Sequence, residues 1–265
     1  MTAPVFIDSD NALGSPMGDV DDAFAMAALL RSNVEVAAIA SVAGNTSERR
    51  AYDNNRSLAE RAGYRGPLLR GADVPSYLAS SPPLRIAALG PLTNIAAAIR
   101  AGATHHHEII IVGANYSTRG RWPPLWPHEF NLTHDRPAAR EVFATQIPLT
   151  IFPLDIARRL TATAPDLRAL RGPLAAYLAK GSRRWLLRLR LLKGTGRFPI
   201  YDLAATLYAN DPEGFTLEET VATMRAKTSI AWGTGTRRVK VCTGFDRDVL
   251  WGRFVALLER ERSHS

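Results

Sequence analysis

The sequence predicts a single α/β domain with a mainly parallel central sheet flanked by helices. Short apolar runs rich in β-branched residues alternate with helical patterns along the 265 residues, and this alternation is typical of a parallel sheet. The links between elements are short, and none is polar or flexible enough to mark a domain boundary. The length permits one large core. We therefore expect residues 1–265 to form one domain.

The first half of the chain carries five expected strands, each an apolar run followed by turn residues. They span residues 5–7, 34–42, 67–70, 84–89 and 109–112. The last of these is almost continuously β-branched, which indicates burial on both faces of the sheet. Helices are expected at 20–30, from a cap at Thr46 or Ser47 to about 62, and at 92–99 after Pro91. Residues 71–83, rich in Ser and Pro, are expected to form a loop.

The second half begins with a long expected loop at 115–129. A helix at 138–145 and a strand at 149–154 follow, and 165–192 is expected to be largely helical. A further helix is expected at 203–208. Two strands, at 228–232 and 239–243, are expected to pair with each other before a final amphipathic helix at 246–260.

Five carboxylates lie between the first strand and the first helix: Asp8, Asp10, Asp19, Asp21 and Asp22. One or two acids at a helix start are ordinary, since the helix dipole favours them. Five converging acids repel each other, and a calcium or magnesium ion bound through carboxylate oxygens would relieve that repulsion. Ligands of α/β proteins bind at the carboxyl ends of parallel strands. The alternative is a solvated acidic loop in which Asp19 or Asp21 caps the helix.

Composition excludes several classes of protein. Apolar residues make up 46% and charged residues 22% of the chain, which are ordinary globular values. Cys242 is the only cysteine, so the fold does not depend on an intrachain disulfide. No apolar run reaches transmembrane length, and the N-terminus leaves no room for a signal peptide before the first strand. A cytoplasmic protein is expected.

The net charge of +8 is unevenly distributed. No acid occurs between Asp166 and Asp202, and this stretch carries a cationic cluster. The cluster consists of Lys180, Arg183, Arg184, Arg188, Arg190, Lys193 and Arg197. The favoured interpretation is the solvated face of a surface helix. The alternatives are an anion-binding rim over an active site and a surface for a polyanion.

Five patches along the chain resemble the inosine–uridine-preferring nucleoside hydrolases. The double aspartate pattern alone is weakly specific, but its combination with Gly-Pro-Leu-Thr-Asn and Glu-Phe-Asn is specific. The patches are Asp8-Ser-Asp10 with Asp21-Asp22, Gly44-Asn45, Ala88-Leu-Gly-Pro-Leu-Thr-Asn94, Glu129-Phe-Asn131 with Asp135, and Asp202. The resemblance implies the family's α/β fold, hydrolysis of the N-glycosidic bond of a ribonucleoside, and one calcium ion at the base of a ribose pocket.

The resemblance also implies the metal ligands. Asp10 would bind calcium and act as general base on a calcium-bound water. Asp22 and Asp202 would be further ligands, Leu89 would contribute its backbone carbonyl, and Asp8 would support the site from behind. Without the family pattern, Asp202 would be interpreted as a helix N-cap.

The remaining implied residues hold the substrate. Asp21 and Asn131 would hydrogen-bond the ribose 2′- and 3′-hydroxyls, Glu129 would hold the 5′-hydroxyl, and Asn45 would touch the sugar or support the site. Cleavage of an N-riboside passes through an oxocarbenium-like cation, which a carboxylate-rich pocket stabilises. Fixing the diol in several places orients the ring for attack.

The chain departs from the family pattern in three places. Residues 11–20 form a longer first loop than the usual Pro-Gly turn, and Asp19 adds charge there. Tyr201 stands where many members have a histidine that protonates the leaving base; His128 is a candidate replacement, and Tyr201 itself could donate a proton or stack. A His-Gly segment is absent from 71–83, and Trp122 and Trp126 either stack on the base instead or simply pack.

Several neighbouring polar residues have a structural interpretation. Thr93 or Asn94 is expected to cap a helix, and Asp135 is expected to cap the next one. The three histidines at 105–107 precede a strand and are expected to be surface residues without a metal.

The leading hypothesis is therefore a calcium-dependent ribosyl hydrolase whose partner is a small-molecule nucleoside. A homologue that binds nucleosides with little or no turnover, and a hydrolase for an anionic or modified nucleoside, are the alternatives. No membrane or nucleic-acid partner is expected. Because family members are commonly dimers or tetramers, the resemblance implies a homo-oligomer.

Overall fold

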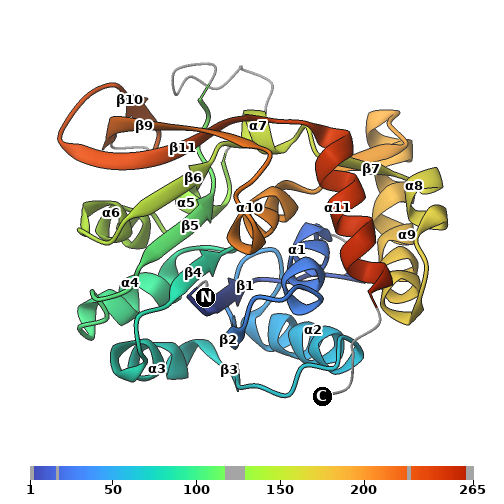
Figure 1. Cartoon of the computed structure of the whole chain (residues 1–265), viewed down its shortest axis with the longest axis horizontal. Coiled ribbons are helices and arrows are strands. Elements are labelled where there is room, and N and C mark those ends of the chain that lie inside the picture. Colours follow the sequence, from blue (N-terminus) through green and yellow to red (C-terminus); the bar gives the residue numbers. More distant parts are fainter. Residues whose placement is uncertain (1–2, 16–17, 117–128, 226–227, 261–265) are drawn as a thin grey trace.

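The fold is built around a nine-stranded sheet whose strand order is β10-β9-β11-β6-β5-β4-β1-β2-β3 (Figure 1). This computed structural model describes residues 3–15, 18–116, 129–225 and 228–260. The strands of the sheet are β1 (Val5–Ser9), β2 (Val36–Ser41), β3 (Leu68–Leu69), β4 (Arg85–Ala88), β5 (Glu108–Val112), β6 (Leu149–Phe152), β9 (Phe215–Met224), β10 (Ile230–Trp232) and β11 (Arg237–Phe245). A separate two-stranded sheet pairs β7 (Thr161–Thr163) with β8 (Arg197–Pro199).

Helices cover both faces of the large sheet (Figure 1). They are α1 (Asp21–Leu30), α2 (Glu48–Arg61), α3 (Val74–Ser80), α4 (Thr93–Arg100), α5 (Asn131–His134), α6 (Arg136–Ala144), α7 (Leu154–Ala157), α8 (Ala164–Ala169), α9 (Pro173–Lys193), α10 (Tyr201–Asn210) and α11 (Arg247–Glu259). The strands from β3 to β11 in the sheet order run parallel, and only β9 and β10 add antiparallel pairs. The predicted α/β fold with a mainly parallel sheet is confirmed.

Strand alternation divides the interior into two cores, because successive side chains point to opposite faces of a sheet. Val5 and Ile7 of β1 join the core under α1, α2, α10 and α11. Phe6, between them, joins the core under α3, α4 and α6. Helices α1 and α10 are buried on almost every side. This dense packing holds the amino ends of both helices in fixed positions beside the carboxyl end of β1.

Two expectations about secondary structure are wrong. Residues 71–83 contain a 3₁₀ turn, Gly71–Asp73, and helix α3 instead of a loop. Val74 and Leu78 lie four residues apart and are both fully buried, so tertiary packing outweighs the Ser- and Pro-rich composition. The two late strands do not pair with each other, because β9 lies between β10 and β11. Strand β9 carries mostly polar, partly exposed residues, which gave it little apolar signal.

The capping expectations have mixed outcomes. Ser47 caps α2 by accepting the Arg50 N–H, and the Asp135 carboxylate caps α6 by accepting the Ala138 N–H. Neither Thr93 nor Asn94 caps α4, which begins at Thr93 without a side-chain cap. Asn94 instead points into the interior beneath β1.

The expectation for the three histidines is wrong at His106, which is buried. Its Nδ1 accepts the backbone N–H of Leu84. Burial lowers the pKa of His106 to about 4, so the imidazole is neutral in the folded protein. His105 and His107 are exposed, as expected.

Within the described residues, no helix is both long and apolar enough to cross a bilayer.

Candidate active site

The acidic cluster forms where the carboxyl end of β1 meets the amino ends of α1 and α10. Asp21 and Asp22 open α1, and Asp202 lies in the first turn of α10. One carboxylate oxygen from each of these three buried residues lies within 4.8 Å of the others. Residues 180 positions apart in sequence therefore converge on one point, as the family pattern implied.

Asp10 is held beside this cluster by the Gly44-Asn45 turn. Its Oδ2 accepts the backbone N–H of Asn45 at 2.5 Å. A Cβ on Gly44 would lie 2.0 Å from that same oxygen, and a Cβ on Gly90 would lie 3.1 Å from Oδ1. The absence of side chains at these two positions lets the backbone enclose the Asp10 carboxylate.

Two further polar residues support the cluster from beneath. Ser9 donates from its hydroxyl to Asp22 Oδ1 at 2.6 Å. Asn94 donates from Nδ2 to Asp8 Oδ1 at 2.9 Å and to the Ser41 carbonyl at 3.0 Å. Asp8 is fully buried and is held by Asn94; its support of the metal site, implied by the family resemblance, stays a prediction. The sequence analysis missed the role of Asn94, because Asn at a helix start is usually a cap.

Burial of so much negative charge raises the carboxyl pKa values. Desolvation is the largest cause at Asp21, Asp22 and Asp202, and repulsion between neighbouring aspartates adds to it, so their pKa values lie well above the ordinary range. Desolvation also raises the pKa of Asp10, and that of Asp8 to about 7. Such a cluster is stable at neutral pH only if protons or a cation neutralise it.

The donor set fits a hard divalent cation. Among the described residues, Asp10 Oδ1 and Asp22 Oδ2 are buried and accept no hydrogen bond. Buried polar atoms normally have partners, so these two oxygens have free lone pairs where a cation would be bound. Carboxylates supplemented by a backbone carbonyl are the ligands that calcium and magnesium prefer.

A pocket of about 330 Å³ opens above the cluster. Its floor contains Asp21, Asp202, Asn45 and the Leu89 backbone region, and Glu129 and Asn131 line one side. The structure thus brings together these sequence-predicted residues. It also adds lining residues that the sequence analysis had not assigned to the site: Val112, Phe130, Leu154, Trp185, Leu189, Thr195 and Pro199. Arg197 lines the pocket too, and it belongs to the cationic cluster for which a rim over the active site was the alternative interpretation.

Glu129 and Asn131 are held by the turn that opens α5. Both Glu129 carboxylate oxygens accept the backbone N–H of Leu132, at 3.0 and 2.8 Å, and burial raises the pKa of Glu129 to about 8. Asn131 donates from Nδ2 to the Leu89 carbonyl at 2.8 Å. That carbonyl retains a second lone pair, which leaves it able to accept another partner.

Tyr201 and Asp19 line the pocket as well. The pKa of Tyr201 is raised, first by desolvation and then by the charges of Asp19 and Asp21. Among its described lining residues the pocket has none from 71–83. His128, Trp122 and Trp126 lie outside the described residues.

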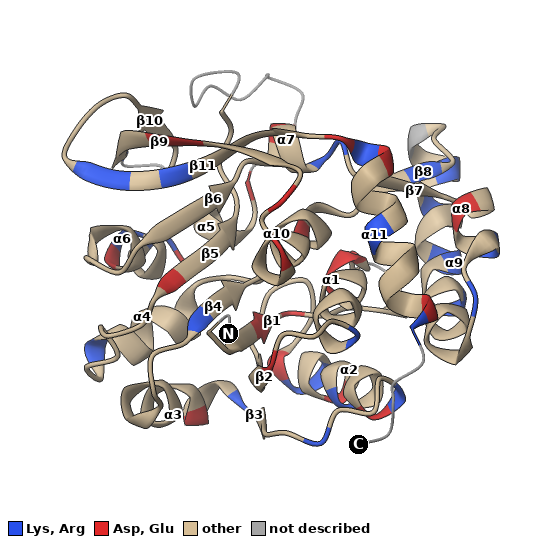
Figure 2. Cartoon of the chain, viewed as in Figure 1, with Lys and Arg blue, Asp and Glu red and all other residues tan. Residues whose placement is uncertain are grey.

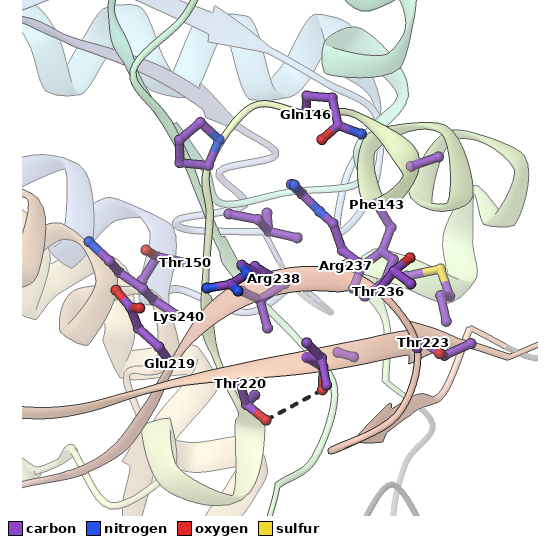
Figure 3. Close-up of a pocket in the computed structure, with 18 of the residues that line it drawn as sticks. Phe143, Gln146, Thr150, Glu219, Thr220, Thr223, Thr236, Arg237, Arg238 and Lys240 are labelled. Carbon is purple, nitrogen blue, oxygen red and sulfur yellow. Dashed lines mark hydrogen bonds between the residues drawn. The ribbon is translucent and has the colours of Figure 1, made fainter.

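A larger groove of about 1270 Å³ lies elsewhere, between α6 and the β9–β11 hairpin (Figure 3). Figure 3 shows Arg237, Arg238 and Lys240 of β11 along it, with Glu219 of β9 nearby. Glu219 is the one carboxylate among its described lining residues. The groove therefore has neither a metal-binding cluster nor paired acids, and the smaller pocket is the candidate active site.

Comparison with known proteins supports this assignment. The sequence profile of the inosine-uridine preferring nucleoside hydrolases matches residues 76–252. The chain belongs to the inosine-uridine preferring nucleoside hydrolase family. The match includes Leu89, Glu129, Asn131 and Asp202 of the pocket.

Curated family relatives include pyrimidine-specific ribonucleoside hydrolases of Escherichia coli. The RihB protein of strain O17:K52:H18 is 28% identical over 213 residues, which cover 71% of this chain and 66% of the relative. RihB of strain O1:K1 is 27% identical over 197 residues, covering 68% of this chain and 61% of the relative. The chain thus spans slightly less than two thirds of the length of these relatives.

Solved structures of family members share the fold. A plant nucleoside hydrolase, PpNRh1, superposes with a TM-score of 0.83 at 22% identity, covering 98% of this chain and 100% of that one. An inosine-guanosine nucleoside hydrolase superposes with a TM-score of 0.81 at 19% identity, covering 97% and 99% of the two chains. The described part of this chain therefore has the fold of these nucleoside hydrolases.

Proposed function

We propose that this protein hydrolyses the N-glycosidic bond of a ribonucleoside or a related N-riboside, giving ribose and the free base. The observation that carries the proposal is the buried cluster of Asp21, Asp22 and Asp202 on the floor of a pocket lined by Glu129 and Asn131. The family membership and the ribonucleoside hydrolases among its relatives support the same activity.

We propose calcium as the cofactor. Asp10, Asp22, Asp202 and the Leu89 carbonyl would hold it, and the partnerless oxygens of Asp10 and Asp22 support this set. When bound, calcium orients a water molecule and lowers the pKa of that water. Magnesium is disfavoured because it requires a small octahedral site and gives up its water reluctantly.

Asp10 would take the proton of the attacking water. Its Oδ1 has no partner within the described protein, while Oδ2 is fixed by the Asn45 N–H. One oxygen thus anchors the carboxylate, and the other, which has two lone pairs, would bind the cation and accept the proton of the neighbouring water. This division holds the carboxylate rigidly, which is the condition for efficient proton transfer.

The ribose would be fixed by groups on two sides of the pocket. Asp21 and Asn131 would bind the 2′- and 3′-hydroxyls, Glu129 would accept the 5′-hydroxyl, and Asn45 would support the sugar near Asp10. As the C1′–N bond lengthens, the ring gains positive charge, and the surrounding carboxylates stabilise it. The same carboxylates disfavour a nucleotide, because a phosphate would be repelled.

The activity is tested by measuring reducing-sugar release from inosine, uridine, cytidine, adenosine and guanosine, with calcium and then with a chelator. Release that the chelator abolishes and added calcium restores is the expected result. The Asp10→Asn variant, which keeps the shape of the side chain but not the base, is expected to lose at least about 100-fold. No release from any nucleoside would contradict hydrolysis.

A second candidate function is nucleoside binding with little or no turnover, favoured by Tyr201 at a position where a histidine is common in the family. Calorimetry with the same nucleosides separates the two functions. Calcium-dependent binding without product would support the binding protein, and ordinary turnover would exclude it.

A further inference from the structure

One wall of the pocket consists of the segment that runs from α9 through β8 to α10. Trp185 and Leu189 come from α9, Thr195 and Arg197 from the turn and strand that follow, and Tyr201 from the start of α10. Figure 2 shows Lys and Arg residues, in blue, gathered on α9 and β8 at the edge of the molecule. The segment ends beside Asp202, which belongs to the acidic cluster.

Strand alternation directs Arg197 toward the pocket. Phe198 is fully buried and packs against Phe24 with ring centroids 5.9 Å apart. In a strand, the residues on either side of Phe198 point the opposite way, and both Arg197 and Pro199 line the pocket. The hydroxyl of Thr195 accepts the Arg197 N–H and donates to the Arg197 carbonyl, each at 3.3 Å, which fixes the backbone at this point.

Arg197 is the one cation among the described residues that line the pocket. It forms no ion pair with another described residue, whereas several other arginines do. It lies four residues before Tyr201, and four extended residues span at most about 14 Å. Arg197 and the acidic cluster therefore line one pocket. Because the acidic cluster would hold the ribose, the remaining lining of the pocket, Arg197 included, is left for the base.

The proposed reaction requires a proton or a positive charge at that position. When the C1′–N bond breaks, its electron pair stays on the base, which becomes an anion unless a proton or a cation reaches it. The described lining residues include no histidine. A guanidinium keeps its charge at every physiological pH and offers several N–H donors in a fixed plane, so it stabilises an anion without giving up a proton.

We propose that Arg197 hydrogen-bonds the departing base and stabilises the negative charge that develops on it. This inference rests on the proposed function. The water oxygen bonds to C1′ as the C1′–N electron pair moves onto the base, the water proton passes to Asp10, and the released base anion takes up a proton from solvent. Arg197 is thus a further catalytic residue, located in a segment where the family pattern implied none.

Trp185 is placed to support the same base. Its indole N–H is shielded from solvent and has no acceptor among the described residues. The Arg188 guanidinium lies 5.2 Å from the centre of its ring, on a side chain that is not among the pocket-lining residues. Trp185 and Arg197 line the same pocket, and an indole ring there offers an apolar surface against which a planar base can pack.

The test compares two leaving groups in the Arg197→Met variant. A natural base is a poor leaving group and depends on stabilisation, whereas 4-nitrophenolate is already a stable anion. We expect kcat for uridine and inosine to fall about 100-fold, the effect of removing one charge-stabilising donor, with little change in KM. For 4-nitrophenyl β-D-ribofuranoside, kcat is expected to change less than about 3-fold. Arg197→Lys is expected to recover part of the loss.

The control is Arg190→Met, which removes an equivalent exposed side chain of α9 that does not line the pocket. Equal losses for both substrates, or unchanged nucleoside turnover, would overturn the role of Arg197. If the wild-type protein cleaves neither substrate, the proposed function itself fails. If it cleaves only the nitrophenyl riboside, hydrolysis stands and the stabilisation of natural bases by Arg197 is refuted.

Discussion

Removing one carboxylate from the acidic cluster is expected to make the metal-free protein more stable. The change is Asp202→Asn, which keeps the size of the side chain. Carboxylate oxygens of Asp21, Asp22 and Asp202 lie within 4.8 Å of one another. Two unit charges at this separation repel by about 3.5 kcal/mol at an effective dielectric constant near 20. If all three carboxylates were ionised, the repulsion of Asp202 by Asp21 and Asp22 together would therefore be about 7 kcal/mol.

Protonation limits this cost. Holding one carboxyl protonated at pH 7, against an ordinary pKa near 3.9, costs about 4 kcal/mol, which is less than the repulsion. The free energy of unfolding of Asp202→Asn is thus expected to exceed that of the wild type by up to about 4 kcal/mol at pH 7 in chelator. The folded wild type holds its proton to higher pH than the unfolded chain, so wild-type stability falls as pH rises. The stability difference between Asp202→Asn and wild type therefore decreases by about 1.4 kcal/mol for each pH unit from pH 7 toward pH 4.

The assay is urea unfolding at pH 5 and pH 7, in chelator and in millimolar calcium. At a calcium concentration 100 times the dissociation constant, the free energy of unfolding of wild type is expected to be about 2.7 kcal/mol higher than in chelator. For Asp202→Asn, most of this calcium-dependent increase is expected to be absent. Asp73→Asn, at an exposed position, is the control and should change neither quantity. The reasoning would be refuted if Asp202→Asn were less stable than wild type in chelator at pH 7. It would also be refuted if calcium raised the free energy of unfolding of the variant as much as that of wild type.

Three other predictions concern the residues around the site and one remote histidine. Gly44→Ala would bring a Cβ to 2.0 Å from Asp10 Oδ2; displacement of that carboxylate is expected to lower nucleoside cleavage about 100-fold, measured by sugar release. Asn94→Ala removes the donor to buried Asp8 and is expected to cost about 1 to 3 kcal/mol of unfolding free energy, measured with urea. Because burial lowers the pKa of His106 to about 4, against about 6.5 unfolded, its neutral form contributes stability above pH 6.5 that is lost as pH falls toward 4. Between pH 7 and 4.5 the free energy of unfolding of wild type is expected to fall by up to about 3 kcal/mol more than that of His106→Gln. Urea unfolding of both proteins at the two pH values measures this difference.

Each of these predictions has a distinct control or contradiction. Gly252→Ala, where a Cβ would meet nothing within 4 Å, should leave cleavage unchanged. Retained cleavage in Gly44→Ala would mean that Asp10 tolerates displacement. An Asn94→Ala protein as stable as wild type would show that Asp8 finds another donor. A His106→Gln stability curve parallel to that of wild type would show that His106 does not titrate across this range.

The sequence predicts the parallel sheet and the location of the acids well, because both depend on local pattern. An apolar run that ends in Asp8 and Asp10, followed by a helix that opens with Asp21, places carboxylates at one edge of the sheet. Asp202 could be joined to them only through the family pattern. Its own neighbourhood indicates no more than a helix start, since its partners lie 180 residues away.

The part of the pocket that carries Arg197 could be predicted only as an alternative, the anion-binding rim over an active site. Arg197 belongs to a run of cations that resembles a solvated helix face, and most of that run is indeed exposed. What distinguishes Arg197 is the strand β8 and its alternation with buried Phe198, and three residues give too short a period to recognise. Strand β9 was missed for a related reason, because its polar face hides the alternation.

The large sheet ends in very short strands on both sides. Strand β3 has two residues and β10 has three. Strand β10 pairs only with Ala222, Thr223 and Met224 of β9, so among the described residues the rest of β9 pairs with β11 alone. A long free strand would be a template on which a second chain could add itself and begin an aggregate. Glu218 and Glu219 are exposed on this part of β9, and charged side chains discourage such pairing. Replacing both by valine would therefore be expected to reduce the yield of soluble protein, even with the pocket at the carboxyl ends of the parallel strands intact.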